Sequence, residues 1–313
     1  MGTVASRKAR RAAAPISAGT RLRVRCPAKI NLGLWILGTR PDGYHEIDTF
    51  LQAVSLEDEI TLEGGPPGFT LETHGLPIPG PGSNLLERAW TLLEESGALP
   101  PGAGVRARLV KRIPVGSGLG GGSSDAAGFL AGVDRLLGLR LSEPELHDLG
   151  ARLGSDVAFF FRGGLARATG RGEQVRHLCP MDPYWIVLAT PATAISTTWA
   201  YAQIKYPLTA SGDAAKVLAS ALMRRDLREV AGAMQNAFEG VILPQLPRIA
   251  DVKRAMSSSG ALGALLSGSG STVFGLTQSR LKAQAVLHAV GGRLAELRVT
   301  RSIEHGVIVS RAG

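Results

Sequence analysis

A dense run of glycines at residues 114–130, PVGSGLGGGSSDAAGFL, constrains this chain more than any other feature. It holds six glycines, three serines and one aspartate between a strand pattern (104–115) and an amphipathic helix pattern (about 124–137). Glycine lets backbone N–H groups approach a ligand closely and adopt positive φ angles. A helix that begins after such a loop adds unpaired N–H donors and a partial positive charge. Together these features predict a site that cradles phosphate.

A simpler interpretation is that Ser123, Ser124 or Asp125 caps the following helix, and we expect one of them to do so. A helix cap does not require the five glycines that precede these residues. Glycine loses more conformational entropy on folding than other residues, so five glycines would be destabilising if the loop only preceded a helix cap.

The better-known phosphate loops fit this segment poorly. Gly116, Gly118 and Gly121 match G-x-G-x-x-G, but the preceding strand carries Lys111 and Arg112 where a dinucleotide fold has an apolar strand. The Gly-Lys-Ser/Thr of a Walker A loop is absent, and so are the H-R-D and D-F-G motifs of protein kinases. The glycine loop of the small-molecule kinases remains.

Composition and charge limit the class of protein. The chain has 313 residues, of which 44% are hydrophobic and 19% charged, typical of a globular protein. Residues 1–23 carry six basic side chains and no acidic ones. Residues 24–313 therefore account for only +3 of the net charge of +9. We expect residues 1–22 to form a disordered basic tail. Two cysteines, Cys26 and Cys179, cannot form a disulfide framework, which predicts a reducing compartment, the cytoplasm.

The order of strand and helix patterns predicts an α+β protein of two domains. Strands are expected on both sides of a turn at Pro27, within residues 21–37, and again over 50–62. A helix capped by Ser83 or Asn84 should end at Gly97, and another should begin at a Ser142–Glu145 capping box. The pattern shifts near residue 180, which divides the chain into residues 23–180 and 181–313.

Three motifs in this order resemble the GHMP kinases: PAKINLGLWIL, PVGSGLGGGSSDAA and LLSGSGSTVFGL. The segments RPDGYHEIDT and LGSDVAFFFRGG extend the resemblance, which covers residues 25–310. It implies a ribosomal-S5-domain-2-like N-terminal domain and a ferredoxin-like C-terminal domain, with the site in the cleft between them.

The resemblance also implies an ATP site. Asn84 and Lys111 should lie near adenine, and Mg²⁺ should arrive with ATP, since no cluster of acidic, His or Cys residues suggests a metal site. A second glycine loop, Ser267, Gly268, Ser269 and Gly270, should approach the first, although such a segment is also typical of a hairpin turn. The phosphate loop itself comprises Pro114, Val115, Gly116, Ser117, Gly118, Leu119, Gly120, Gly121, Gly122, Ser123 and Ser124.

Asp156 and Lys29 are the candidate catalytic residues. Asp156 follows a Gly-Ser turn before an apolar run, where an ordinary helix cap is the alternative. Lys29 stands between apolar residues on a strand, where an edge lysine reaching into water is the alternative. The resemblance implies that Asp156 takes the substrate proton while Lys29 holds its charge. Asn31, on the same strand face, should bind the same end of the substrate.

A tyrosine–histidine pair after a turn is the candidate base clamp. The resemblance implies that Tyr44 stacks on cytosine and His45 bonds its edge, with Thr197 and Tyr201 forming the opposite wall. The implied reaction is phosphorylation by ATP of the 2-hydroxyl of 4-diphosphocytidyl-2-C-methyl-D-erythritol, a step towards isoprenoid precursors in bacteria or, less expectedly, in plastids.

Two rival functions remain open at the level of sequence. One is another kinase of this family that acts on mevalonate or homoserine, against which the Tyr44–His45 loop argues. The other is a non-catalytic ligand- or RNA-binding protein, against which the joint presence of Lys29 and Asp156 argues. We therefore expect a small-molecule substrate and neither nucleic acid nor membrane as partner.

Overall fold

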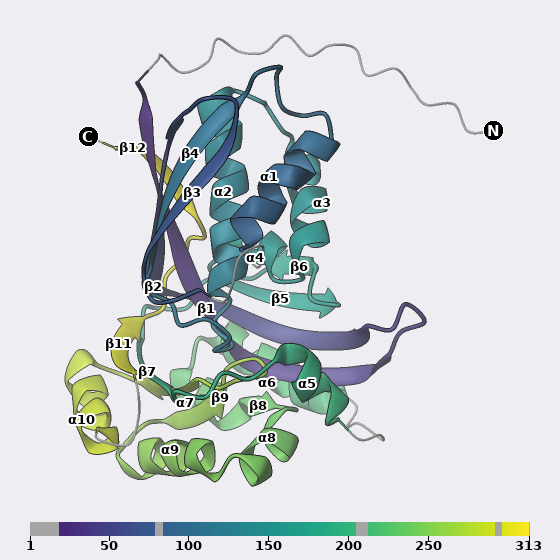
Figure 1. Ribbon diagram of the computed structural model, residues 1–313. Coiled ribbons are helices and arrows are strands. Elements are labelled where there is room, and N and C mark those ends of the chain that lie inside the picture. The colour runs from purple at the N-terminus through teal and green to yellow at the C-terminus, as the bar shows by residue number, and fades with distance from the viewer. Residues whose placement is uncertain (1–18, 79–83, 205–211, 292–295, 313) are drawn as a thin grey trace.

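The computed structural model describes residues 19–78, 84–204, 212–291 and 296–312, which form two β-sheets with helices packed against them (Figure 1). The first sheet has the order β12-β1-β2-β4-β3, and β5, β6 and β8 extend it beside β1 and β2. Its strands are β1 (Arg21–Thr39), β2 (His45–Gly64), β3 (Gly68–Gly75), β4 (Gly104–Lys111), β5 (Leu165–Gly170), β6 (Gln174–His177), β8 (Gln235–Asn236) and β12 (Ile308–Arg311).

The two longest strands, β1 and β2, run the whole length of the first sheet, as Figure 1 shows. The expected break at Pro27 is wrong, because β1 continues through it. The register of β1 against β2 shifts between Pro27 and Ala28. A bulge leaves one residue out of the hydrogen-bonded ladder, so it can accommodate proline, which has no N–H to donate.

Burial along β1 changes from alternating to continuous. Residues 21–25 alternate between exposed and buried, as in a strand with one solvated face. From Cys26 to Ile36 every residue is buried. Leu22 and Val24 pack on the helices of the first sheet, whereas Ile30 and Leu32 belong to a core shared with the second sheet. The central part of β1 is therefore covered on both faces, and the site is built there.

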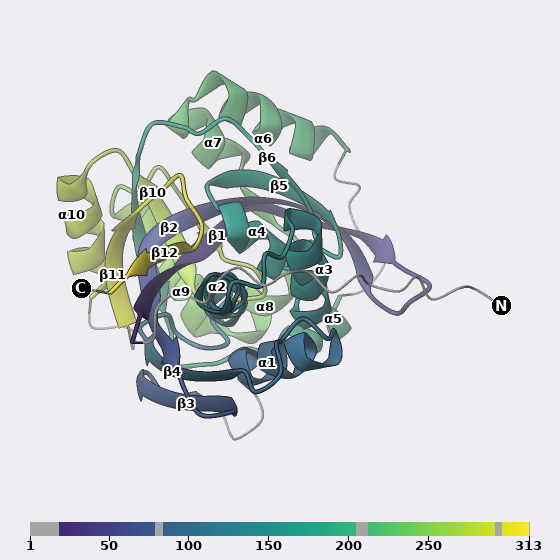
Figure 2. The ribbon, with the colours of Figure 1, turned by 90° about the horizontal axis from the view of Figure 1, so that it is seen from above.

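Helix α2 (Gly121–Leu137) is the centre of the first unit, and Figure 2 shows it end-on against the curved sheet. It begins at Gly121 rather than near residue 124, and its N-cap is Gly120, with no side-chain hydrogen bond. The expectation that Ser123, Ser124 or Asp125 caps the helix is therefore wrong. The remaining helices here are α1 (Leu85–Glu95), α3 (Glu143–Leu153) and α4 (Val157–Arg162).

Two of the expected helix starts are confirmed in detail. Asn84 caps α1, with its Oδ1 accepting from the Leu86 N–H at 3.0 Å, while the alternative cap, Ser83, lies outside the described residues. At the start of α3 the Glu145 carboxylate accepts from the Ser142 N–H at 2.9 Å, as in a capping box.

The second sheet is antiparallel, with the order β11-β7-β10-β9. Numbered along the chain this is the order 4-1-3-2, which makes the second unit ferredoxin-like, as expected. It comprises strands β7 (Trp185–Thr190), β9 (Gly263–Leu266), β10 (Val273–Thr277) and β11 (Glu296–Arg301), and helices α5 (Thr197–Ala202), α6 (Gly212–Arg224), α7 (Leu227–Ala233), α8 (Glu239–Gln245), α9 (Pro247–Ser258) and α10 (Arg280–Val290).

The chain returns to the first sheet at its end. Although β7 begins at Trp185, close to the expected division at residue 180, the last strand β12 pairs antiparallel with β1. The boundary at residue 180 stays a prediction. In the described part of the chain, no helix combines the length and apolar character that crossing a membrane would require.

We predict that Gly128→Ala destabilises the first unit, although alanine is the better helix former. A Cβ at Gly128 would lie 2.5 Å from the Sγ of buried Cys26 and 3.0 Å from Val24. Overpacking of this kind costs about 1–3 kcal/mol. Gly232→Ala in α7 is the control, because its Cβ meets no atom within 4 Å. Urea unfolding should show a loss of stability for the first variant alone, and equal midpoints would contradict this packing.

Candidate active site

A cavity of about 510 Å³ lies where β1, the N-terminus of α2 and the loops of the second unit meet. Both glycine loops border it, as do side chains from each unit. Among its lining residues are Lys29, Asn31, Thr49, Asn84, Lys111, Asp125, Asp156, Arg171, Thr197, Tyr201, Gly268 and Ser269, together with most of residues 114–123.

Five of the nine residues of the first glycine loop that line this cavity are glycines, so much of its wall here is backbone. Gly116, Gly118 and Gly120 have φ angles of +65°, +79° and +72°, which side chains with a Cβ rarely adopt. Because Gly120 caps α2 without a side chain, the first N–H groups of the helix stay available to a ligand. The loop therefore has the backbone geometry of an anion cradle.

The second glycine loop packs directly on the first, as the sequence predicts. The Ser267 hydroxyl donates to the Gly118 carbonyl at 3.0 Å, and the Thr272 N–H donates to the Ser117 carbonyl at 3.1 Å. A Cβ at Gly118 would lie 1.9 Å from the Ser267 carbonyl oxygen. This segment is therefore more than a hairpin turn, since it fixes the position of the phosphate loop.

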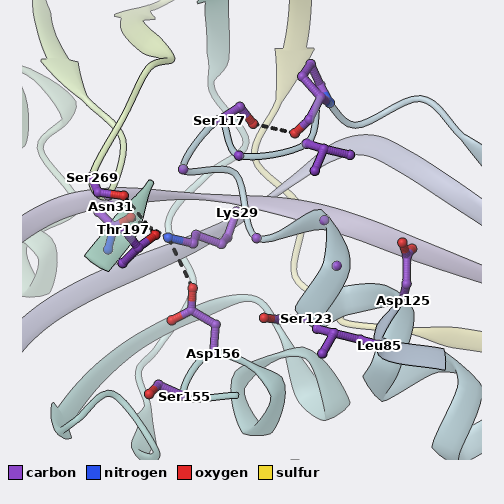
Figure 3. Close-up of a pocket in the computed structure, with 18 of the residues that line it drawn as sticks. Lys29, Asn31, Leu85, Ser117, Ser123, Asp125, Ser155, Asp156, Thr197 and Ser269 are labelled. Atoms are coloured by element: carbon purple, nitrogen blue, oxygen red, sulfur yellow. Dashed lines mark hydrogen bonds and ion pairs between the residues drawn. The ribbon is translucent and has the colours of Figure 1, made fainter. Parts of the chain in front are cut away.

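Lys29 is buried in an interior strand, not exposed on an edge. Only 4% of it is accessible, it pairs with Ala53 of β2, and its backbone N–H donates to the Leu119 carbonyl at 2.9 Å. Its Nζ donates to the Asn31 Oδ1 at 2.6 Å and pairs with the Asp156 carboxylate at 3.3 Å (Figure 3). The structure thus brings together the three residues that the sequence assigned to the reacting end of the substrate.

Asp156 immediately precedes α4, but its side chain does not cap that helix. Asp156 therefore occupies the N-cap position of α4 without the side-chain hydrogen bond of an ordinary cap. Its carboxylate is 29% exposed and is directed towards Lys29 across the cavity, as Figure 3 shows. A carboxylate that is paired with one cation and still accessible has an oxygen free to accept a proton.

Lys111 has a different environment from Lys29. Its Nζ donates to Asp58 at 2.5 Å and to Asp125 at 2.8 Å, and all three side chains are buried. Burial by itself would lower the pKa of Lys111, but the two carboxylates raise it above its ordinary value. Burial also raises the pKa of Asp125, which the Lys111 charge opposes. Lys111 lines the cavity, yet its charge is balanced within the protein.

The candidate base clamp lies at the other end of the site. The His45 and Tyr201 rings stack with centroids 4.5 Å apart, which brings together one residue from each unit. Burial lowers the pKa of His45 and raises that of Tyr201, to which the charge of Asp156 also contributes. Thr197 shares a hydrogen bond with Ser269 at 3.2 Å. Tyr44 is 53% exposed, and neither it nor His45 lines the cavity itself.

Two cavity residues carry charge that sequence reasoning missed. Arg171, in the turn between β5 and β6, places its guanidinium 4.6 Å from the centroid of the Tyr44 ring. A Cβ on the neighbouring Gly172 would lie 3.8 Å from the Asp156 Oδ1, so this turn adjoins the candidate base. Asp125 was considered only as a helix cap. The sequence signal available for Arg171 was a basic residue in the turn GRGE, residues 170–173, which follows the LGSD motif.

Within the described ranges, no group of three or more His, Cys, Asp or Glu side chains could hold a metal ion. The acidic residues of the cavity are instead engaged with lysines. Asp156 pairs with Lys29, and Asp125 pairs with Lys111.

Comparison with protein families finds two matches in chain order. The model for the N-terminal domain of GHMP kinases matches residues 84–164, and the model for their C-terminal domain matches residues 218–296.

Relatives of known name match over nearly the whole chain. The 4-diphosphocytidyl-2-C-methyl-D-erythritol kinase of Gloeobacter violaceus is 38% identical over 297 residues, covering 93% of this chain and 97% of that protein. The enzyme of the same name from Symbiobacterium thermophilum is 43% identical over 277 residues, covering 88% and 94%.

Solved structures agree with this similarity. A crystal structure of 4-(cytidine 5′-diphospho)-2C-methyl-D-erythritol kinase superposes with a TM-score of 0.72 at 32% identity, covering 90% of this chain and 98% of that one. A homoserine kinase from Cytophaga hutchinsonii reaches a TM-score of 0.74 at 22% identity, covering 94% and 99%, and shares the fold.

Proposed function

This chain belongs to the 4-diphosphocytidyl-2-C-methyl-D-erythritol kinases, a branch of the GHMP kinases, and from that premise we propose its reaction. It transfers the γ-phosphoryl group of ATP to the 2-hydroxyl of 4-diphosphocytidyl-2-C-methyl-D-erythritol, giving the 2-phosphate and ADP. The observation that carries the proposal is the Lys29–Asp156 pair, 3.3 Å apart, facing a glycine-lined cavity. The reaction supplies an intermediate for isoprenoid precursors in the cytoplasm.

The triphosphate binds along the two glycine loops. Phosphoryl transfer needs charge stabilisation and positioning more than covalent chemistry from the protein. The N–H groups of residues 116–123 and the N-terminus of α2 supply donors for the phosphate oxygens. Mg²⁺, when bound with ATP, would neutralise charge on the triphosphate and would be held mainly by phosphate oxygens and water.

Asp156 and Lys29 act on the acceptor hydroxyl. The hydroxyl oxygen attacks the γ-phosphorus, the bond from that phosphorus to the bridging oxygen of ADP breaks, and Asp156 takes the hydroxyl proton. Lys29 stabilises the negative charge that develops beside it. Asn31 orients Lys29 through its Oδ1, and its amide is itself held by the Thr49 hydroxyl at 2.8 Å. The reacting groups are therefore positioned before the substrate binds.

The cytidine end of the substrate binds beyond this pair, between the two units. Tyr44 offers an aromatic face for cytosine and His45, stacked on Tyr201, offers a ring nitrogen to the edge of the base. Thr197 lines the cavity between these rings and Lys29. Arg171 adjoins both Tyr44 and the Asp156 loop, where the diphosphate linking the base to the polyol has to pass.

An assay of ADP release with Mg-ATP tests the proposed substrate. The cytidylated methylerythritol, mevalonate and homoserine are offered separately at equal concentration. We expect turnover with the first alone, because only it carries a base for the Tyr44–Tyr201 end and a diphosphate for Arg171. Turnover with mevalonate or homoserine instead would refute the proposed substrate, while the chain would still be a small-molecule kinase.

We predict that Asp156→Asn lowers kcat by about two to four orders of magnitude, because the amide cannot take the hydroxyl proton. Binding of ATP and of the acceptor should stay near normal, since the shape of the side chain is preserved. Asp148→Asn makes the same change at an exposed position of α3 and serves as the control. An unchanged kcat in Asp156→Asn would refute the role of this residue as base.

We predict that Arg171→Gln raises the KM for the cytidylated substrate by roughly 10–100-fold, the value of a hydrogen bond to a charged group. The KM for ATP should change little, because the phosphate loop lies at the other side of Lys29. Arg176→Gln, on β6 of the same hairpin and outside the cavity, is the matched control. An equal rise in both KM values would argue for a general disturbance of the hairpin.

A further inference from the structure

Asn236 is a buried amide that does not line the cavity but is bonded to the second glycine loop, which does. It ends the short strand β8. Its Nδ2 donates to the Leu266 carbonyl and to the Gly268 carbonyl, both at 2.8 Å. Its Oδ1 accepts from the Phe238 N–H at 2.9 Å. Both amide hydrogens are therefore used on the backbone of the loop and of the strand before it.

Strand β8 is fixed to β1, the strand that carries Lys29. Asn236 pairs with Leu34 in the parallel ladder of β8 and β1, and the next N–H, that of Ala237, donates to the Leu34 carbonyl at 2.9 Å. The backbone of Asn236 thus belongs to the first sheet, whereas its side chain holds the end of β9 in the second sheet. One residue therefore ties the second glycine loop to the strand of the candidate catalytic lysine.

A second side chain, that of Glu239, holds the same strand end by its other backbone group. Its Oε1 accepts from the Leu266 N–H at 3.0 Å, and its Oε2 pairs with Lys253. Because β9 is the last strand in the order of its sheet, these two side chains bond the backbone groups that a further strand would otherwise pair. Of the two, Asn236 is the one that also bonds to the glycine loop itself.

The placement of Gly268 bears directly on Lys29. A Cβ on this glycine would lie 3.4 Å from the Lys29 Nζ and 3.4 Å from the Asn31 Oδ1. Its φ angle is +54°, in the region that favours glycine, so its peptide groups can turn more easily than those of other residues. A lysine ammonium has three N–H donors, and Lys29 uses them on Asn31 and towards Asp156. A carbonyl released at Gly268 therefore stands beside an ammonium that it can compete for.

We propose that Asn236 is a positioning residue for phosphoryl transfer, which holds the Gly268 carbonyl away from Lys29 and so keeps the ammonium available to the reacting atoms. The inference rests on the proposed function, in which Lys29 stabilises the charge that develops there. Buried carbonyls are almost always paired, so without the two Asn236 donors the Gly268 carbonyl turns to the adjacent ammonium. Lys29 is then drawn from Asp156 towards the loop, although Asn236 itself touches no substrate.

Asn236→Asp tests this role, because it removes both donors but keeps the side-chain shape and the acceptor for the Phe238 N–H. With Mg-ATP and the cytidylated methylerythritol we expect kcat to fall roughly 100-fold, the scale of a small misplacement of catalytic groups. The KM values of both substrates should stay near those of the wild type, since the lost contact acts in the transition state. The turnover is expressed per ATP-binding site, counted by calorimetry, so that unfolded protein does not lower it.

Two matched controls separate this role from charge and from strand stability. Gln235→Glu makes the same change from amide to carboxylate one residue earlier, at an exposed position of β8. Glu239→Gln removes the ion pair with Lys253 beside Leu266 and does not touch Gly268. Both should keep kcat per ATP-binding site near that of the wild type. If Asn236→Asp keeps its kcat, or if either control loses as much, the positioning role is refuted.

A crystal structure of Asn236→Asp shows where the loop goes. We expect the Gly268 carbonyl to have turned from residue 236 towards the Lys29 ammonium, and an unchanged loop would overturn the proposal. If the wild type turns over no acceptor, the proposed function fails, whereas this structure still decides what Asn236 holds in place.

A measurement on the wild type covers the case in which Asn236→Asp does not fold. In NMR spectra of the full chain with ATP bound, both Nδ2 hydrogens of Asn236 should exchange slowly with water, because each is bonded to a buried carbonyl. Rapid exchange of these hydrogens would overturn the proposal, since the amide would then not hold the loop.

Discussion

The backbone contact between the two glycine loops is the constraint on which the site depends. Gly118 lies so close to the Ser267 carbonyl that no other residue fits there, and the Ser267 hydroxyl returns a hydrogen bond to the Gly118 carbonyl. The same approach brings Gly268 to the Lys29 ammonium: a Cβ at Gly268 would lie 3.4 Å from its Nζ. One close packing of backbone thus determines how a loop of the second sheet faces a strand of the first.

Two buried lysines of the site differ in the carboxylates that surround them. Lys29 is paired with a single carboxylate, that of Asp156, which remains partly accessible to the cavity. Lys111 is shared by two carboxylates and is itself almost wholly buried. A buried ion pair contributes little net stability once desolvation is counted, so such groups are better explained by positioning than by stability. Lys29 holds Asp156 and Asn31 together beside the cavity, and Lys111 fixes the carboxylates of Asp58 and Asp125.

The sequence predicted the site better where its residues form local motifs than where the fold assembles them. The glycine loops, Asp156 and Lys29 stand in motifs, and the ferredoxin-like second unit was implied by the resemblance that those motifs carry. The turn expected at Pro27 does not form, because a bulge against β2 lets the proline remain within the strand. Local pattern suggested no role for Asp125 beyond a helix cap, and the GRGE turn marked Arg171 only as a cation. Their roles depend on Asp58 and Tyr44, which are distant in sequence and become neighbours only through the pairing of β1 and β2 with the other strands.

The arrangement of charges along the cavity separates recognition from chemistry. Asp125 and Arg171 both line the cavity that holds the Lys29–Asp156 pair, and Asp125 is oriented by an ion pair with Lys111 whereas Arg171 packs on the Tyr44 ring. Phosphoryl transfer requires the acceptor oxygen and the γ-phosphorus to meet in line at that centre, and little else from the protein. Binding energy from contacts at the two ends of the substrates can therefore be used to position the acceptor oxygen and the γ-phosphorus between them.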